Sequence, residues 1–345
     1  MKRMNLKSLI LISIWASLVL SIPGHAQQRP ELKFRADGTF KILQLTDIHM
    51  QHLNEASQKA IKNIHTMLDL EKPDFVVITG DVIFAAPGEP GLQRVLEPLI
   101  SRKVPYAVTW GNHDNNDCDM TRREMQDYVQ KQPFNLGFRV DGLNDESTLN
   151  ESVFNIPVRG SRSDRVASVI WCMDSGDGST VKDVKGYGWI SPEQIEWYNR
   201  ESRAFTKANN GVPLPALAFY HIPVPEYDEA IATKESHWVG HKLEGVACPQ
   251  LNTGFFAATK INGDVMGHFC GHEHNNDFVT MWHGILLAYG RFSGGNTVYN
   301  DLDYNGGRVI ILREGVREFE TYVRLRNGDI IEHVYYPKLI WKIEN

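Results

Sequence analysis

The chain has 345 residues, of which 42% are hydrophobic and 23% are charged, and its formal net charge at pH 7 is −6. This length and balance are typical of a globular protein with a substantial core. A negative chain without a basic run is a poor candidate for binding a nucleic-acid polymer, whose phosphates require Lys and Arg side chains.

The N-terminus has the layout of a secretory signal peptide. Basic residues within the first seven positions precede an apolar run from Leu9 to Ile22, and small residues follow up to Ala26. The run is short for a bilayer span, so we expect residues 1–26 to be cleaved and no membrane span to remain. The mature chain, residues 27–345, would then be exported, to the periplasm or outside the cell, as a single domain.

The next part of the chain alternates strand and helix patterns. The apolar runs Thr39–Leu45, Asp74–Thr79 and Val104–Trp110 predict buried strands. Between them, Asn54–Leu70 and Gly91–Ser101 have helical spacing of apolar residues. This alternation favours a parallel sheet covered by helices.

Strand patterns become more frequent after residue 150. Ser152–Val158 and Val166–Met173 alternate as an antiparallel pair does, and Leu217–Tyr220 predicts another strand. From Asp264 onward, short strands separated by Gly and Asn turns are expected. The predicted fold class is therefore α/β, a sandwich of two β-sheets flanked by helices.

One helix start in this region is well marked. Ser191, Pro192 and Gln194 have the pattern of a capping box with proline at the first helical position. The pattern predicts that Gln194 returns its side chain to the Ser191 backbone. The helix should run to about Phe205.

The four cysteines fall into two groups. Cys172 and Cys270 lie in apolar runs and are predicted to be buried thiols. Cys118 and Cys248 lie in polar, loop-like segments. An exported protein permits disulfides, so a Cys118–Cys248 bridge is left open.

Polar clusters directly follow five of the predicted strands. Ligands bind beyond the carboxyl ends of strands in α/β sheets, so we expect the clusters to face one crevice. Because the set contains no cysteine, it suits zinc, iron or manganese. It is too large for one four-coordinate zinc and suits two divalent or mixed-valence ions that share a carboxylate. The candidate ligands are Asp47, His49, Asp81, Asn112, His221, His272 and His274.

The clusters read DIH, GD, GNHD, a lone histidine and GHEH, and in this order they resemble the signature blocks of the calcineurin-like metallophosphoesterase superfamily. The resemblance runs from about Phe40 to Gly295 and implies a four-layer αββα fold. The segments KILQLTDIH, YGWISPEQIEWY and GHEHNNDF are similar to the exported, small, single-domain purple-acid-phosphatase-like proteins. In one departure, Phe84 stands where purple acid phosphatases have a tyrosine ligand, so the tyrosinate-to-iron colour should be absent.

The resemblance also implies a role for each residue of the set. Asp81 would bridge the two metals, and His113 would face the substrate phosphate without touching a metal. The remaining ligands divide as Asp47, His49 and His274 on the first metal, and Asn112, His221 and His272 on the second.

The predicted function is an exported dinuclear-metal phosphoesterase that acts on a small phosphate ester, with phosphomonoesters expected. A metal-bound hydroxide would attack phosphorus, while His113 stabilises charge or protonates the leaving group. Asp114 could orient His113 or cap the following helix, and Asn115 is a candidate for substrate contact. Two alternatives stay open: a phosphodiesterase or nucleotide hydrolase on the same site, and a non-catalytic exported binding protein. The oligomeric state is left open.

Several polar residues near these blocks have two interpretations each. Arg291 could bind a phosphate oxygen or pair with an acid, and Tyr187 and Trp189 could form a pocket wall or an ordinary packed loop. Asn275 and Asp277 could hold the neighbouring histidines or touch the substrate. His241, with His237 four residues before it, lies in a segment predicted to be a loop.

Overall fold

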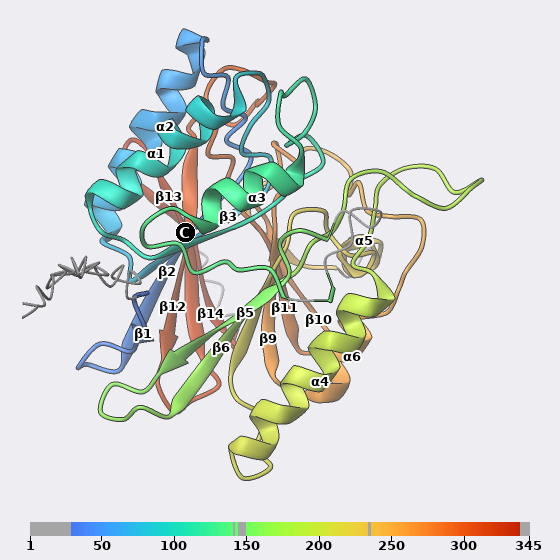
Figure 1. The fold of residues 1–345 in the computed structure, drawn as a ribbon. Coiled ribbons are helices and arrows are strands. Elements are labelled where there is room, and N and C mark those ends of the chain that lie inside the picture. The colour runs from blue at the N-terminus through green and yellow to red at the C-terminus, as the bar shows by residue number, and fades with distance from the viewer. Residues whose placement is uncertain (1–28, 141, 144–149, 234–235, 339–345) are drawn as a thin grey trace, which may run out of the picture.

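The computed structural model of the protein describes residues 29–140, 142–143, 150–233 and 236–338 (Figure 1). The signal peptide predicted at residues 1–26 therefore lies outside the described part of the chain. Within the described ranges, no helix has the length and apolar character that a membrane crossing requires.

The strands form two sheets (Figure 1). The six-stranded sheet has the order β14 (Ile330–Tyr336), β13 (Phe319–Leu325), β12 (Gly306–Arg313), β2 (Thr39–Leu45), β3 (Phe75–Thr79) and β4 (Tyr106–Thr109). The eight-stranded sheet has the order β1 (Leu32–Lys33), β5 (Phe154–Arg159), β6 (Val166–Cys172), β7 (Ala216–Phe219), β9 (Val265–Cys270), β11 (Ile285–Tyr289), β10 (Val279–Trp282) and β8 (Trp238–Val239).

Helices cover the outer face of each sheet (Figure 1). The six-stranded sheet carries α1 (Gln58–Glu71), which follows the 3₁₀ turn η1 (Glu55–Ser57), together with α2 (Gly88–Ser101) and α3 (Arg122–Gln130). The eight-stranded sheet carries α4 (Pro192–Ala208), α5 (Glu226–Ile231) and α6 (Phe255–Asn262). The layers are therefore helix, sheet, sheet and helix, which confirms the predicted fold class.

The alternation of side chains along each strand explains why the sheets stack. In β3, Val76 and Ile78 belong to the core under the helices, whereas Phe75 and Val77 belong to the core between the sheets. The same central core takes Phe219 from β7 in the other sheet. Both faces of these strands are apolar, as expected for parallel strands buried on two sides.

The parallel strands bring their carboxyl ends together. β2, β3 and β4 are parallel neighbours, as are β6, β7, β9 and β11. The turns that follow the strands are hydrogen-bonded to one another: Asp47 N–H donates to Gly80 O at 3.2 Å, and Gly271 N–H donates to His221 O at 3.0 Å. The polar clusters at these strand ends therefore lie at one edge of the sandwich.

The structure corrects the capping-box prediction for α4. Ser191 Oγ accepts the Gln194 N–H, but Gln194 does not return its side chain to the cap. Gln194 is fully buried; its Oε1 accepts the Asp174 N–H, and its Nε2 donates to Asp174 O and Asn150 Oδ1. Burial favours these contacts, because polar groups without water must find protein partners.

Two further sequence expectations were settled by the structure. All four cysteines are free, so Cys118 and Cys248 are not bridged, and Cys172 and Cys270 are buried as predicted. The segment between His237 and His241, predicted to be a loop, contains the short strand β8 paired with β10.

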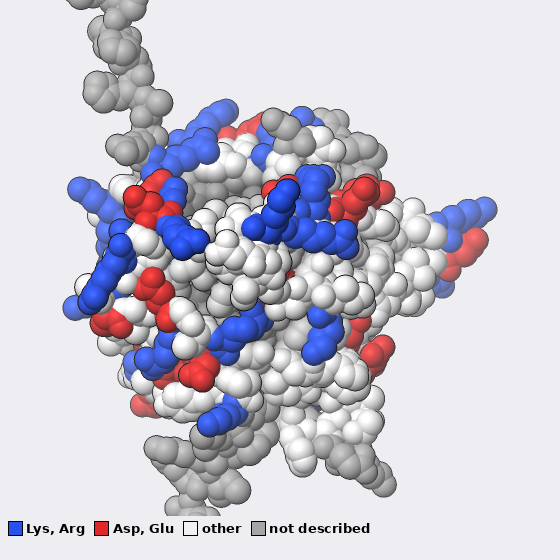
Figure 2. Space-filling model, turned by 90° about the horizontal axis from the view of Figure 1, so that it is seen from below, with Lys and Arg blue, Asp and Glu red and all other residues white. Residues whose placement is uncertain are grey.

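The surface mixes charges of both signs on the face seen from below. Figure 2 shows Lys and Arg side chains interspersed with Asp and Glu side chains there, without a continuous basic stripe among the residues described on that face.

Candidate metal centre

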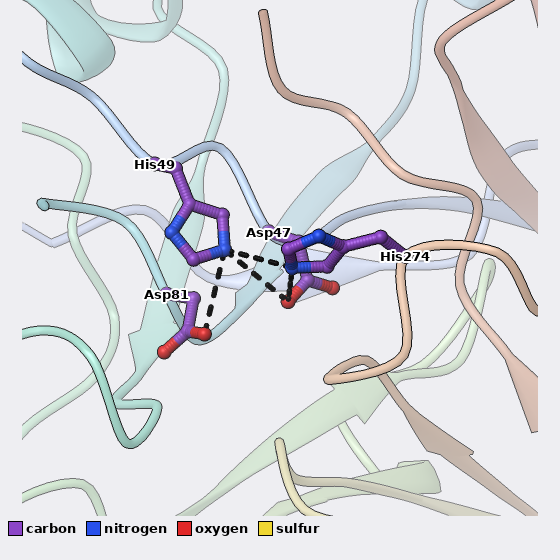
Figure 3. A group of neighbouring side chains, drawn as sticks. All are labelled: Asp47, His49, Asp81 and His274. Carbon is purple, nitrogen blue, oxygen red and sulfur yellow. Dashed lines mark hydrogen bonds and ion pairs between the residues drawn. The ribbon is translucent and has the colours of Figure 1, made fainter. Parts of the chain in front are cut away.

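The first group of candidate ligands is a tight, buried cluster (Figure 3). His49 Nε2 lies 3.0 Å from His274 Nε2, and Asp47 Oδ1 lies 3.9 Å and 3.8 Å from these two nitrogens. Asp81 Oδ2 completes the group at 3.5 Å from His49 Nε2. The four ligand atoms lie within 4.8 Å of one another, close enough to surround one ion.

The second group lies on the other side of Asp81. His221 Nε2 lies 3.1 Å from Asn112 Oδ1 and 3.3 Å from Asp81 Oδ2. The His272 ring packs edge to face on the His221 ring, with 5.1 Å between centroids. Asp81 Oδ2 is thus shared by both groups, and the structure brings all seven candidate ligands together.

Unpartnered polar atoms test whether these residues fit metal ions. Asp81 Oδ2, His49 Nδ1 and His272 Nε2 are buried and have no hydrogen-bond partner. Each such buried group costs about 1–3 kcal/mol unless something satisfies it. Bound cations would satisfy the Asp81 oxygen and the His272 nitrogen. The donor set of carboxylate, amide and imidazole is the one that zinc, iron and manganese accept.

Backbone carbonyls orient two of the imidazoles. His221 Nδ1 lies 2.9 Å from Thr79 O, and His274 Nδ1 lies 2.9 Å from Tyr299 O. Because a carbonyl only accepts, Nδ1 carries a hydrogen in both rings, so Nε2 is the nitrogen left to bind a metal once it has lost its own proton. This is the arrangement in which histidine binds metal.

Burial and mutual charge set the protonation of the cluster. Burial lowers the pKa of His49 to about 3 and holds that of His272 well below its ordinary value. Burial alone would raise the pKa of Asp81, but the neighbouring histidines, His221 first, together outweigh it and hold this pKa low. Burial likewise opposes a charge on His221, yet Asp81 raises its pKa to about 10. The Asp81 carboxylate is therefore ionised and ready to bind cations.

The backbone at the ligands is itself unusual. Four of the seven ligands have φ between +47° and +83°, a region that side-chain-bearing residues rarely adopt. Such strain clusters at functional sites, where the surrounding structure enforces it. The four residues are Asp47, His49, Asp81 and His272.

His113 lies beside the cluster and lines a cavity next to it. The Asn116 side-chain amide donates to His113 Nδ1 at 2.9 Å, so the neutral ring carries its hydrogen on Nε2. The Phe84 ring packs edge to face on both His113 and His49, with centroids 5.1 Å and 5.2 Å away. Phe84, which stands where purple acid phosphatases have a tyrosine ligand, thus packs against these two histidines.

Asp114 has neither of the roles predicted from the sequence. Its carboxylate does not bond to the His113 ring, and the N-cap of the next helix, α3, is Thr121. It accepts the backbone N–H groups of Asp81, Val82, Ile83 and Gly111 at 2.6–3.0 Å. Asp114 is therefore a positioning residue that joins the turn after β3 to the turn after β4.

The cavity has a volume of about 410 Å³ and opens onto both groups of ligands. Tyr187 is part of its wall, so the pocket interpretation of this residue is correct, whereas Trp189 and Asn115 are not among the lining residues. Wider hollows of about 590 Å³ along α4 contain none of the candidate ligands. The cavity is lined by His113, Tyr187, Glu244, Gly245, Val246, Ala247, His272, Glu273, His274 and Tyr299.

The structure decides the open roles of the other polar residues. Arg291 pairs with Asp277, with 2.5 Å between Nη1 and Oδ2, so it binds an acid and not a phosphate. Asp277 also accepts from His241, which lies just after β8. Asn275 bonds to Asp301 and does not line the cavity. These residues support the turns around the centre.

Sequence reasoning missed Tyr299 and the segment Glu244–Ala247. Both come from loops that carry no local pattern of strand, helix or ligand. The only indirect signal is the run of polar residues after His274, because Asn275 N–H donates to Glu244 Oε1 at 2.7 Å. These loops reach the site through tertiary packing.

Comparisons with known proteins show the family to which the chain is related. The family model described as calcineurin-like phosphoesterase matches residues 40–276. The protein named Probable inactive purple acid phosphatase 29, from Arabidopsis thaliana, is 31% identical over 331 residues, which cover 84% of this chain and 81% of that one. Phosphatase DCR2 of Saccharomyces cerevisiae is 28% identical over 282 residues, which cover 74% of this chain and 48% of that one.

Solved structures share the fold. A dimetal phosphatase from Danio rerio matches with a TM-score of 0.59 at 12% sequence identity, over 86% of this chain and 98% of that chain. At this identity the likeness shows the fold alone. Together with the family match, it confirms the resemblance seen in the sequence.

Proposed function

The chain belongs to the calcineurin-like phosphoesterase family, and on that premise we propose that it is an exported, metal-dependent hydrolase of phosphate esters. We further propose that its substrates are small phosphomonoesters. The cavity beside the ligand cluster has a volume of about 410 Å³, which supports a small substrate.

The observation that carries the proposal is the position of Asp81. Its Oδ2 lies 3.5 Å from His49 Nε2 and 3.3 Å from His221 Nε2 and has no hydrogen-bond donor. Such an oxygen suits a bridge between two cations. One ion would be held by Asp47, His49, Asp81 and His274, and the other by Asp81, Asn112, His221 and His272.

Metal ions in such a pair supply Lewis acidity and an activated water. The chain adds a hydrogen-bond donor, because the neutral His113 ring carries its hydrogen on Nε2 and lines the cavity. This N–H can donate to a phosphate oxygen or to the leaving oxygen. Asp114 keeps the turns that bear Asp81 and Asn112 in register.

The first experiment separates metal binding from turnover. In a His113→Ala variant, we expect the metal content to equal that of the wild type and kcat on an aryl phosphate to fall about 10²–10⁴-fold. A His65→Ala variant, altered on α1 away from the centre, is the control. Wild-type turnover in His113→Ala would reject the role assigned to His113.

One observation favours a second candidate, a non-catalytic binding protein on the same scaffold. The relative from Arabidopsis thaliana is named as inactive, whereas the one from Saccharomyces cerevisiae is named as a phosphatase. All seven candidate ligands are present in this chain, which supports activity. Metal analysis with aryl phosphomonoester and phosphodiester assays decides between them: absence of bound metal and of hydrolysis would support the binding protein.

Export rests on the layout of residues 1–26, a basic start followed by an apolar run and small residues. We expect expression in a bacterial host with a secretion pathway to give a protein that begins near Gln27 in the exported fraction. Mass determination of the intact protein measures this. Full-length protein in the cytoplasm would contradict export.

A further inference from the structure

The cavity beside the metal centre has a charge pattern that a phosphate alone does not explain. Among the described residues that line it, none is Lys or Arg, although these residues are the usual protein ligands of phosphate. The nearby Arg291 is buried and engaged with Asp277 and with Tyr304 O. The lining therefore offers imidazoles, together with the proposed metals, to the phosphoryl group, and the rest of the wall is left for another part of the substrate.

Two tyrosines belong to the rest of the cavity wall, and each lies beside a ligand of one of the proposed metals. The Tyr187 ring packs edge to face on His272, with 4.3 Å between centroids, and the Tyr299 ring lies 4.4 Å from the His274 ring. Tyr299 is 57% exposed. Its hydroxyl donates to Glu244 Oε2 at 3.1 Å, so this hydrogen is not free for a phosphate oxygen.

The acidic side of the wall is held rigidly. Glu244 Oε1 accepts the Asn275 N–H at 2.7 Å, while Oε2 accepts from Tyr299. Asn275 also bonds to Asp301 through its amide nitrogen and its amide oxygen, at 2.8 Å and 2.6 Å. These bonds join the two loops that the sequence left unassigned. Glu244 is therefore a fixed negative charge beside exposed aromatic surface.

Carboxylates and tyrosine rings, with no Lys or Arg among the described residues that line the cavity, form a site for a positive group, although the Lys242 ammonium lies 3.5 Å from Glu244 O. On the premise of the proposed function, we propose that the substrate is a phosphomonoester of an amino alcohol, with its ammonium group beside Glu244 and the two tyrosines. Hydrolysis breaks the phosphorus–oxygen bond to the amino alcohol and forms one to the water oxygen. The protonated His113 ring gives its Nε2 proton to the leaving oxygen and takes a proton back from the attacking water.

A matched pair of esters tests the ammonium preference. Phosphocholine and 3,3-dimethylbutyl phosphate have the same shape and differ only in nitrogen for carbon. We expect kcat/KM of the metal-loaded enzyme to be about tenfold or more higher for phosphocholine, the ratio that a cation–aromatic contact of about 1.4 kcal/mol gives. Equal values, or a preference for the neutral ester, would overturn the inference.

Variants assign the preference to the cavity wall. In Glu244→Gln, which keeps an acceptor for Tyr299, we expect the ratio of the two kcat/KM values to fall several-fold. A Tyr187→Leu variant tests the cavity wall independently of the Glu244 hydrogen bonds. It should also lower the ratio of the two kcat/KM values. Glu318→Gln is the control, because Glu318 is exposed in the turn between β12 and β13, at the opposite end of β2. An unchanged ratio in both cavity variants would reject the assignment.

Calorimetric binding of the two esters separates this inference from the proposed function. If the metal-loaded protein hydrolyses no ester yet binds phosphocholine more tightly than its neutral analogue, the proposed function fails and the cation site stands. If it hydrolyses aryl phosphate but binds and hydrolyses both alkyl esters equally, the function stands and the cation site fails.

Discussion

At Gly111 and Gly271 the backbone passes so close to a ligand carboxylate that no side chain fits. A Cβ on Gly111 would lie 2.2 Å from Asp81 Oδ1. A Cβ on Gly271 would lie 1.9 Å from Thr46 Oγ1 and 2.7 Å from Asp47 Oδ2. Real Cβ contacts do not approach this closely, so each glycine in GNHD and GHEH makes room for a ligand from another strand end.

A single methyl group at Gly271 should therefore disturb metal binding. In Gly271→Ala, we expect Asp47 to shift and metal affinity to fall about 10–100-fold, as for loss of a ligand-orienting contact. Metal content after dialysis and a competition titration measure the effect. Gly178→Ala is the control, because its added methyl meets nothing nearer than 3.8 Å. Wild-type affinity in Gly271→Ala would contradict the steric argument.

At the scale of elements, buried side chains fasten the helices and loops that carry the centre. Arg122, at the start of α3, bonds to Asp174 Oδ1 at 2.6 Å, and both side chains are almost fully buried. It also donates to Gly111 O, in the turn that bears Asn112, and to Gly176 O. One guanidinium thus joins α3, the turn after β4 and the loop after β6.

Removing this guanidinium should destabilise the protein strongly. In Arg122→Met, Asp174 keeps a buried charge without its cation, which costs about 3–5 kcal/mol of the free energy of unfolding. Urea denaturation measures the loss. Arg200→Met is the matched control, because the Arg200–Glu201 pair is exposed and worth at most about 1 kcal/mol. Equal losses in the two variants would contradict the importance of burial.

A second network joins β8 to β14. His241 Nδ1 lies 3.1 Å from Asp277 Oδ1 and 3.1 Å from Glu332 Oε1. Arg291 and Arg308 contact the same two acids. Asp277, followed by Glu332, raises the pKa of His241 to about 10. Protonated His241 is therefore the form that holds the two strands together.

The raised pKa of His241 predicts a pH dependence of stability. A pKa above the unfolded value of about 6.5 means that the stabilisation is complete below about pH 6.5 and is lost as the pH rises toward 10. We expect the wild type to exceed His241→Gln in unfolding free energy at pH 6, by less than about 1 kcal/mol because His241 is half-exposed. The difference should shrink at pH 9.5, and His65→Gln should show no such trend. A difference that grows with pH would contradict this sign.

At the scale of the whole molecule, the candidate centre lies at the seam of the two sheets. The turns after β2, β3 and β4 supply Asp47, His49, Asp81 and Asn112, and the turns after β7 and β9 supply His221, His272 and His274. Ions bound there would link two sheets that otherwise meet through the apolar core between them. Metal binding and global stability should therefore be coupled.

Metal loading should raise the melting temperature of the wild type. A ligand that binds only the folded state stabilises it by about 2.7 kcal/mol at one hundred times its dissociation constant. We expect chelation to lower Tm and zinc or manganese to restore it. An Asp81→Asn variant, which weakens the shared ligand, should respond much less. The same metal-induced shift in both proteins would mean that the stabilising ions bind elsewhere.

The candidate ligands and the fold class could be predicted from the sequence because both follow from local patterns of apolar and polar residues. Apolar runs of strand length, each followed by Asp, Asn or His, place polar groups at strand ends, and parallel strands carry those ends to one edge. The predicted strand over Thr39–Leu45 and the helix in Asn54–Leu70 rest on such periodicity. The two β-sheets were predicted from the same strand and helix patterns.

Only the tertiary structure decided what surrounds the ligands. Asp114 binds four backbone N–H groups of two turns, and Gln194 leaves its helix cap for Asp174, because buried polar groups take the partners that packing places beside them. Glu244 and Tyr299 enter the cavity from loops without periodicity. Local sequence sets the ligand types and their strand-end positions, whereas the cavity wall depends on contacts between segments far apart in the chain.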